Sequence, residues 1–499
     1  MKFFLYKLIF LFLLTSPISS PAQKSKANQN IKNEIDKYIK AEMKKEQVPG
    51  LTYAIIKDGE IITSGAYGVA NVELNAPISM HSLFSIGSIG KIFTATAIML
   101  LQKDGRLSLT DPIAKYLDSL PGSWNNITIK HLLSQTSGIK DHLHDFPGYS
   151  YIERDRKQEI TEAQFIRMAT TVPLNFEPGE KWAYSNAGFV LLGFIIHKVS
   201  GQPLPQFMKE RVFEPLDMKE TRYISLAEII PNRATGYLLN DTNKVINGDY
   251  ISNFYSTTAD MGIITTAGDM AKWSIALDNE KIIDKQTLQQ MWTPFKLNNG
   301  MESTNLNGCN YGLAWMLSNY RGYNEIGHNG SFRNGYTANY IRFDEKHLAV
   351  IVLCNLNPSS IKWICYNIAA FFVPELKGID QLKPEQNSDT SFNKNVHALL
   401  KGLAEDNLDT SLVTASFKQR INPITKMNYK PVPGIKSSIT FIHSDIIADK
   451  NLVRYGWPIK KINYYKTNIG NKYNIGNKTD YYIGVFITPD NKIADMREY

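Results

Sequence analysis

The order of strand-like and helix-like segments most constrains how this chain can fold. Strand-like runs come early, with Leu51–Ile56 followed by the Asp58-Gly59 turn signal and a second short apolar run. They return only within 311–353, whereas about 106–255 shows mostly helical segments between loops that carry Pro and Gly. This order predicts an α/β (α+β) domain over 31–376, in which a sheet domain carries an all-helical insertion.

Hydrophobic periodicity places the individual elements. Ile31, Ile35, Ile39 and Met43 recur at near-helical spacing, so we expect a helix over 31–46 after a polar leader at 23–30. Further helices are expected at Ile92–Leu101, Ala187–Val199 and Ile361–Phe372, and further strands at Tyr311–Trp315, Thr337–Phe343 and Leu348–Leu353.

A second, smaller domain is expected after the first. The chain has 499 residues, and at about 100–200 residues each, two to three domains are expected. Residues 377–390 are polar and typical of a linker, and 391–416 has a helical pattern. Long strands are expected at Ser437–Ile447, Leu452–Lys466 and Tyr481–Thr488. These elements predict a small α+β C-terminal domain over 391–499, whose role the sequence does not indicate.

Residues 1–22 have the pattern of a signal peptide. Lys2 and Lys7 precede the apolar run Leu8–Leu14, which is too short to span a bilayer, and Ala22 ends a stretch suited to cleavage. The alternative is an uncleaved membrane anchor over the same segment. No later run of about 18 apolar residues occurs, so we expect no integral membrane segment after cleavage and a periplasmic or secreted protein.

Charge and cysteine content exclude several classes of protein. The formal net charge is +8, but without a dense run of Lys and Arg, so no nucleic-acid partner is expected. A mild basic surplus instead suits an anionic cell-surface polymer. Cys309, Cys354 and Cys365 show no C-x-x-C spacing, so neither a zinc knuckle nor a disulfide framework is predicted. The oligomeric state does not follow from the sequence.

Ser88 and Lys91 form the first candidate catalytic pair. In Ser88-Ile89-Gly90-Lys91, at the start of an apolar helix, positions i and i+3 share a face with Cβ atoms about 5–6 Å apart. A serine hydroxyl needs a base to become a nucleophile, and a lysine can fold back onto it. The helix start also presents the backbone N–H of Ser88 to an oxyanion. Taken alone, a helix-capping serine followed by a surface lysine explains the same residues.

Tyr184-Ser185-Asn186 is the second candidate motif. It follows a Pro-Gly loop and precedes the expected helix at Ala187–Val199. A nearby lysine cation favours phenolate, so Tyr184 is expected to lose its proton more easily than a free tyrosine. Asn186 can orient Lys91 or bind a substrate amide, because its side chain both donates and accepts hydrogen bonds. The alternative is an ordinary helix cap beside a packed tyrosine.

His328-Asn329-Gly330-Ser331 is the third candidate motif. It precedes the expected strand at Thr337–Phe343, and Gly330 permits close approach of a substrate to the backbone. The alternative is a plain Asn-Gly turn, since Asn334-Gly335 follows shortly afterwards.

The three motifs, in this order and with a helical insertion between the first and the last, resemble those of the serine β-lactamase and penicillin-binding protein superfamily. Tyr-Ser-Asn and His-Asn-Gly are similar to the branch of class C β-lactamases, D-alanyl-D-alanine carboxypeptidases and esterases. Further agreement comes from Leu107–Pro112, His131–Gly138 and Ser256–Trp273. The resemblance covers about 31–376 and implies a β-lactamase/transpeptidase-like fold, in which helices flank an antiparallel sheet.

The resemblance also implies a role for each motif residue. Ser88 is the nucleophile that becomes acylated, and Lys91 and Tyr184 share the general-base and general-acid work. The implied substrate-binding residues are Asn186, His328, Gly330 and Ser331. The backbone N–H groups of Ser88 and Ser331 form the oxyanion hole, and neither metal nor cofactor is required.

The implied substrates are D-amino-acid peptides, peptidoglycan-derived molecules and small esters. A β-lactamase proper is an alternative, although position 328 usually carries lysine there and a histidine is only partly protonated near neutrality. That difference favours a peptidase or esterase. A second alternative is a non-catalytic sensory protein that binds muropeptides through its C-terminal domain. A third is a zinc hydrolase centred on His142 and His144 within Asp141–Asp145.

Overall fold

The computed structural model describes residues 21–143, 159–240, 242–304, 309–332, 334–357, 361–383, 390–405, 407, 409–420, 439–446, 453–454, 457–458, 461–467 and 481–498. Several predicted features lie outside this set: residues 1–20 of the signal peptide, 384–389 of the linker, and His144 and Asp145 of the zinc alternative. Ala22 itself is described, but the structure does not test cleavage after it, so this site stays a prediction.

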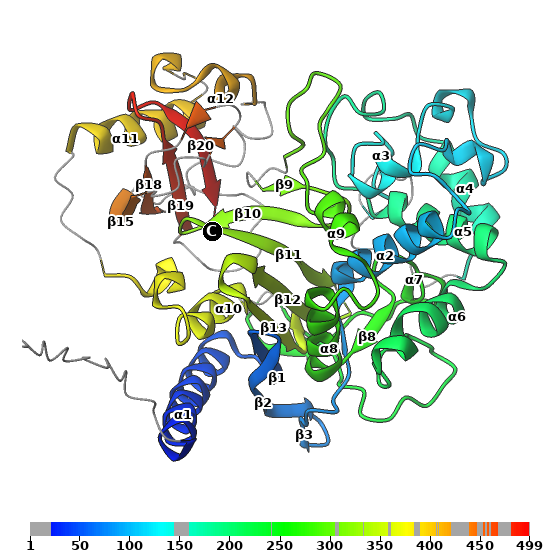
Figure 1. Cartoon of the computed structure of the whole chain (residues 1–499), viewed down its shortest axis with the longest axis horizontal. Helices are drawn as coiled ribbons and strands as arrows, with labels where there is room; N and C mark the ends of the chain where they lie inside the picture. Colours follow the sequence, from blue (N-terminus) through cyan, green and yellow to red (C-terminus); the bar gives the residue numbers. More distant parts are fainter. Residues whose placement is uncertain are drawn as a thin grey trace, which may run out of the picture.

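An antiparallel sheet of eight strands forms the centre of the molecule (Figure 1), in the order β3-β2-β1-β13-β12-β11-β10-β9. The strands are β1 (Gly50–Lys57), β2 (Glu60–Asn71), β3 (Ala76–Pro77), β9 (Asn310–Tyr311), β10 (Met316–Tyr320), β11 (Tyr323–Phe332), β12 (Tyr336–Phe343) and β13 (Leu348–Cys354). Strand β1 pairs with both β2 and β13, so the two ends of the main domain meet in one sheet. The predicted antiparallel sheet is confirmed.

Helices cover both faces of this sheet. On one face, α2 (Gly90–Lys103) and α8 (Ala267–Asp278) share a core with the even-numbered positions of β1, 54 and 56. On the other, α1 (Pro21–Glu46) and α10 (Ile361–Ala369) pack with its odd-numbered positions, 51 to 55. Successive strand residues point to opposite faces, and because both faces are covered, β13 is a continuous apolar run.

A mostly helical lobe extends from the α2 side of the sheet (Figure 1). Its helices are α3 (Ile129–Leu133), α4 (Glu162–Thr170), α5 (Asn186–Ser200), α6 (Leu204–Met208) and α7 (Asn253–Ser256), with α9 (Lys285–Met291) nearer the sheet. The lobe also contains the short strands β5 (Arg222–Tyr223), β6 (Tyr237–Leu239) and β7 (Val245–Asn247). Two small sheets join these to β4 (Phe84–Ser85), β8 (Ile263–Thr265) and β14 (Leu356–Asn357). Strands of two or three residues are too short to show a hydrophobic period.

The C-terminal part combines two helices with a second antiparallel sheet, of order β15-β18-β19-β20. Its elements are α11 (Thr390–Glu405), α12 (Ala415–Arg420), β15 (Ile439–Ile446), β16 (Val453–Arg454), β17 (Trp457–Pro458), β18 (Lys461–Thr467), β19 (Tyr481–Ile487) and β20 (Ile493–Glu498). The single helix expected over 391–416 is wrong. Asp409 accepts a hydrogen bond from the Ser411 N–H at 2.9 Å and starts a separate turn between the two helices.

The C-terminal sheet packs against the main domain. Ile442, Ile462 and Tyr464 belong to the same buried cluster as α10 and the end of β10. There, the rings of Tyr320 and Tyr366 stack with centroids 3.9 Å apart. The second sheet thus shares a core with the face of the main sheet that carries α1 and α10.

Two further expectations differ from the structure. The polar leader at 23–30 lies within α1, because its Lys, Gln, Ala and Asn residues contain no helix breaker. The strand expected at Tyr311–Trp315 ends at Tyr311, and β10 begins only at Met316. Ala314 has a left-handed φ of 67°, which interrupts the extended backbone between them.

Across the described ranges, no single helix combines the length and hydropathy needed to cross a membrane. Residues 186–200 and 204–216 reach those limits only as a pair bent by 77°, and the first of the two, α5, is largely buried in the core.

Candidate active site

Ser88 lies in a short 3-10 turn, η1 (Gly87–Ile89), between β4 and α2. Gly87 has a left-handed φ of 48°, and a Cβ at that position would lie 3.1 Å from the backbone nitrogen of Ser331. Glycine therefore lets η1 turn sharply while it approaches β11. The turn holds Ser88 half-buried, one helical turn ahead of Lys91.

Lys91 is fully buried and connects three parts of the site. Its Nζ lies 3.0 Å from the Oγ of Ser88, 2.7 Å from Oδ1 of Asn186 and 3.1 Å from the carbonyl oxygen of Asp260. Burial lowers the pKa of Lys91 to about 8, against the opposing effect of the Asp260 and Asp141 carboxyls. A lysine with this pKa is partly neutral near physiological pH and can accept a proton from Ser88.

Tyr184 lies on the loop before α5, with its ring centroid 5.0 Å from Nζ of Lys91. Burial raises the pKa of the Tyr184 hydroxyl well above its usual range; a hydrogen bond with Ser88 opposes this, and Asp141 and Asp260 add to it. This direction is opposite to the one expected from the sequence. Tyr184 keeps its proton at neutral pH and is placed to donate it.

Asn186 is held by partners on both sides of its amide. Its Oδ1 accepts the bond from Lys91, and its Nδ2 donates to Oδ2 of Asp141 at 3.0 Å. Both polar atoms of the amide are engaged, so the orientation of Asn186 is fixed. Asp141 thus orients the amide that accepts the hydrogen bond from Lys91. This relation could not be predicted, because Asp141 and Asn186 are far apart in the sequence.

The zinc alternative receives no support from this arrangement. Asp141 is engaged by Asn186, and Nδ1 of His142 lies 3.7 Å from Oδ1 of the same carboxylate. Among the described residues, no group of three metal-ligating side chains comes together.

Asp260 is a second buried carboxyl beside Lys91. It is fully buried, and its oxygens have no hydrogen bond of normal geometry with the described residues. Burial raises the pKa of Asp260 to about 6, while the nearby Lys91 cation works against that shift. The sequence did not point to Asp260, because neither of the two acids within Ser256–Trp273, Asp260 and Asp269, carries a sign of its burial.

His328 lies within β11 and not in a turn. Pairing between β11 and β12 continues from Ile326 to Phe332, so the alternative of an Asn-Gly turn at this motif is wrong. Nδ1 of His328 lies 2.6 Å from the Asn329 carbonyl oxygen, and Nε2 lies 3.2 Å from the Tyr311 hydroxyl. A carbonyl only accepts, so Nδ1 carries the proton and Nε2 accepts from Tyr311.

The protonation state of His328 differs from the prediction, which was a histidine partly protonated near neutrality. Burial, followed by repulsion from Lys91, lowers the pKa of His328 to about 3. The imidazole is therefore neutral at physiological pH. It fixes the Tyr311 hydroxyl and provides no cation for a substrate carboxylate.

Gly330 and Ser331 bring β11 against the backbone of Ser88. A Cβ on Gly330 would lie 1.8 Å from the Ile86 carbonyl oxygen and 3.2 Å from the backbone nitrogen of Ser88, so only glycine fits. The backbone N–H groups of Ser88 and Ser331 therefore lie on two facing segments. The Ser331 hydroxyl points elsewhere and donates to Oδ1 of Asn357 at 2.6 Å.

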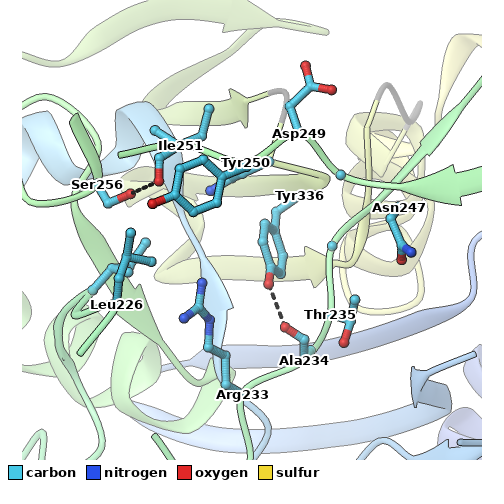
Figure 2. Close-up of a pocket in the computed structure, with 14 residues that line it drawn as sticks. Leu226, Arg233, Ala234, Thr235, Asn247, Asp249, Tyr250, Ile251, Ser256 and Tyr336 are labelled. Atoms are coloured by element: carbon cyan, nitrogen blue, oxygen red, sulfur yellow. Dashed lines mark hydrogen bonds between the residues drawn. The ribbon is translucent and has the colours of Figure 1, made fainter. Parts of the chain in front are cut away.

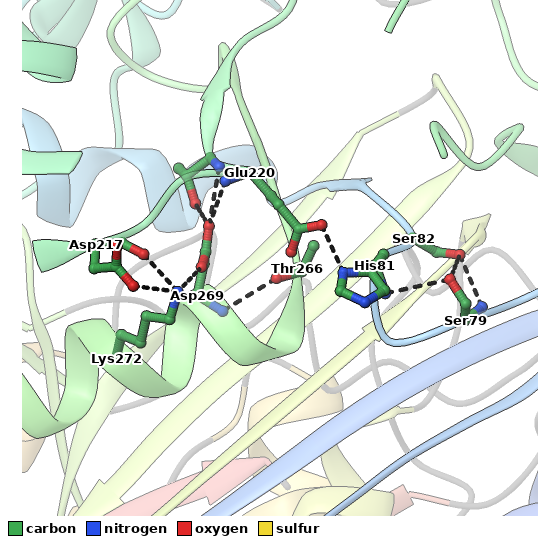
Figure 3. Close-up of polar contacts among 9 residues, drawn as sticks. Ser79, His81, Ser82, Asp217, Glu220, Thr266, Asp269 and Lys272 are labelled. Atoms are coloured by element: carbon green, nitrogen blue, oxygen red, sulfur yellow. Dashed lines mark hydrogen bonds and ion pairs between the residues drawn. The ribbon is translucent and has the colours of Figure 1, made fainter. Parts of the chain in front are cut away.

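The stretch from Thr265 to Met270, noted for its resemblance, serves the fold. The hydroxyl of Thr266 caps α8 by accepting from the Asp269 N–H (Figure 3). The Asp269 carboxylate accepts bonds from the backbone N–H groups of Glu220 and Thr221 and from the Thr221 hydroxyl. This buried carboxylate ties α8 to the loop before β5.

Substituting Asp269 by alanine is expected to lower the free energy of unfolding by about 2–4 kcal/mol, because three donors, two of them buried, lose their acceptor. Urea denaturation of wild type and variant measures the change. Asp217→Asn is the matched control: this exposed carboxylate contacts Lys272 and Lys219 at the surface, and asparagine tolerates its left-handed φ of 56°. A loss below about 1 kcal/mol for Asp269→Ala would contradict this structural role.

A serine hydroxyl within 3.0 Å of a buried lysine, a tyrosine that retains its proton and a strand packed close to the serine backbone form the kind of site that a serine hydrolase needs. A sequence profile described as Beta-lactamase matches residues 35–361. This chain belongs to that family.

Similarity to individual proteins supports the same family assignment. Penicillin-binding protein 4* of Bacillus subtilis (strain 168) is 30% identical over 346 residues, which cover 66% of this chain and 72% of that protein. Protein flp of Staphylococcus aureus (strain MW2) is 27% identical over 65% of this chain, which spans 63% of its length. The solved structure of an octameric penicillin-binding protein homologue from Pyrococcus abyssi superposes with a TM-score of 0.60 at 25% identity, covering 94% of this chain and 98% of that one.

Proposed function

We propose that this serine hydrolase acts through an acyl-enzyme on D-amino-acid peptides, peptidoglycan-derived molecules or small esters. The contact between Lys91 Nζ and Ser88 Oγ at 3.0 Å carries this proposal. Neutral Lys91 takes the Ser88 proton as the oxygen attacks the substrate carbonyl, and the N–H groups of Ser88 and Ser331 bind the resulting oxyanion. Tyr184 gives its proton to the leaving group and recovers one from Lys91. Water then releases the acyl group by the reverse path.

The geometry of β11 supports an extended substrate. Its pairing with β10 ends at Gly327, so the edge at 328–332 is not covered by that strand. A peptide can lie along such an edge by main-chain hydrogen bonding, with its scissile carbonyl over the facing N–H groups. A peptide or peptide-like ester fits this arrangement.

The neutral His328 favours a peptidase or esterase over a β-lactamase proper. A lysine at that position is a permanent cation for the carboxylate of a β-lactam, whereas this imidazole is uncharged and already bonded to Tyr311. The names of the relatives, which call them penicillin-binding, support the use of a penicillin as an acylating probe.

A comparison of three substrates tests the proposal. Rates are measured with a D-alanyl-D-alanine peptide, p-nitrophenyl acetate and a chromogenic cephalosporin, each with wild type and Ser88→Ala. We expect the peptide or the ester to be hydrolysed fastest and all Ser88-dependent turnover to disappear in the variant. Fastest turnover of the cephalosporin would replace the proposal by a β-lactamase. Absence of turnover, with muropeptide binding through 391–499, would favour the sensory alternative.

We further propose that the protein is exported by its N-terminal segment to the periplasm or the medium. N-terminal sequencing of protein from fractionated cells is expected to begin at Gln23. An intact N-terminus in the membrane fraction would support the uncleaved anchor instead.

A further inference from the structure

A recess of about 400 Å³ lies next to the C-terminal end of β11, where the chain turns into β12 (Figure 2). Its walls come from residues 224–236, residues 247–256 and the connection from β11 to β12 with Asn334 and Tyr336. This volume is within the range of pockets that bind small molecules. Neither Ser88 nor Lys91 lines it, so the recess is separate from the nucleophile.

The recess adjoins the facing N–H groups. In the β11–β12 pair, Ser331 lies opposite Thr337 and Phe332 lies opposite Tyr336. Strands about 4.8 Å apart with a rise of about 3.3 Å per residue place the Cα atoms of Ser331 and Tyr336 roughly 6 Å apart. On the opposite wall, the Ala234 N–H donates to the carbonyl of Leu83 at 3.1 Å, in the segment that leads to Ser88. A substrate held at Ser88 can therefore extend into the recess.

The position of the proton donor indicates which part of a substrate lies there. Tyr184 protonates the leaving group in the proposed mechanism, and its ring lies 6.4 Å from that of His328. Along β11, His328 precedes Gly330 whereas the recess follows Ser331. The leaving group is thus on the His328 side, and the acyl group points towards the recess.

The lining combines one cation, Arg233, with apolar and aromatic side chains and with polar groups such as those of Thr235 and Ser256. In Figure 2, the Arg233 side chain extends towards the space between Leu226 and Tyr336, and the Asp249 carboxylate is directed away from it. Leu226 and Tyr250 are 37% and 58% exposed. Arginine keeps its charge at physiological pH and binds carboxylates in a bidentate manner. These features fit a negatively charged group on a short hydrocarbon stem.

We propose that the recess is the subsite for the acyl portion of the substrate, and that Arg233 selects acyl groups which carry a carboxylate. This inference rests on the proposed acyl-enzyme function and names the substrate class within it. Peptides whose acyl side carries an acidic residue belong to that class.

The test uses D-alanine p-nitroanilides that differ only in their N-terminal cap: succinyl, butyryl or 4-aminobutyryl. For each, kcat/KM is measured together with the concentration that halves labelling of Ser88 by a fluorescent penicillin. Wild type is expected to prefer the succinyl over the butyryl compound by about tenfold, a typical effect of one charged hydrogen-bonding pair. Arg233→Gln is expected to lose this preference while its reaction with the butyryl compound stays within about twofold, and Arg233→Glu to prefer the 4-aminobutyryl compound.

Arg222→Gln is the matched control, because Arg222 lies outside the recess and contacts Glu228 at 3.7 Å. It should keep the wild-type preference, and normal penicillin labelling of every variant shows that the site is folded. Equal values for the succinyl and butyryl compounds in wild type, or an unchanged preference in Arg233→Gln, would overturn the subsite while Ser88 labelling leaves the proposed function standing. Failure of Ser88 to react with any of these compounds or with the penicillin would instead overturn the proposed function.

Discussion

Replacing Ser88 with alanine is expected to lower kcat/KM by about 10⁵-fold, the order of loss seen when a catalytic nucleophile is removed. Only one oxygen is lost, and Lys91 keeps its contacts with Asn186 and Asp260. The fold should therefore persist, so the loss measures the chemistry. Initial rates with the best substrate, together with thermal unfolding of the same preparation, provide the comparison.

Ser331→Ala is the matched control for this prediction. Ser331 is proposed to contribute its backbone N–H, and its hydroxyl donates away from Ser88 to Asn357. The variant should therefore stay within about tenfold of wild type, far above Ser88→Ala. Ser88→Ala activity within about tenfold of wild type would show that another residue attacks the substrate.

The second large effect concerns Lys91. Lys91→Met removes the base at 3.0 Å from Ser88 and is expected to lower kcat/KM by about 10³- to 10⁴-fold. In wild type, the pKa of Lys91 is lowered to about 8 by burial, and only the neutral form accepts a proton. Activity should therefore rise with pH up to about 8 and fall tenfold per unit below it. A pH profile of kcat/KM from pH 5 to 10 measures this limb.

The pH profile of Asp260→Asn identifies the group whose titration produces the fall in kcat/KM below about pH 8, which we call the acidic limb. The Asp260 carboxylate raises the pKa of Lys91, so its replacement by a neutral amide should move the limb to lower pH. His328 cannot produce a limb near pH 8, because burial lowers its pKa to about 3. A profile that keeps its position in Asp260→Asn would assign the limb to a group other than Lys91.

Local patterns predicted the strands β1, β12 and β13 and the helices α1, α2 and α10, but not β10, β11 or α8. The apolar runs of β1 and β13 depend on neighbours within the same strand, and the sequence shows those directly. The break at Ala314 and the start of a new turn at Asp409 were missed, because each depends on the conformation of a single residue. Propensity patterns average over such positions.

The sequence predicted the motif residues of the candidate site, but neither its electrostatics nor its two buried carboxyls. Ser88, Lys91, Tyr184 and Asn186 come together around one buried ammonium group, as their motifs indicated. The charge states of the tyrosine and of His328 depend on burial, which no motif encodes. The two carboxyls beside Lys91 come from distant segments, so their proximity could not be inferred from spacing.

Peptide mapping of the adduct formed with a penicillin tests the central claim most directly. The protein is incubated with benzylpenicillin, quenched, digested and analysed by mass spectrometry, in parallel with Ser88→Ala. We predict a penicilloyl adduct on the peptide that contains Ser88, and none in the variant. An adduct on a different residue, or one that persists in Ser88→Ala, would contradict the assignment of Ser88 as the nucleophile.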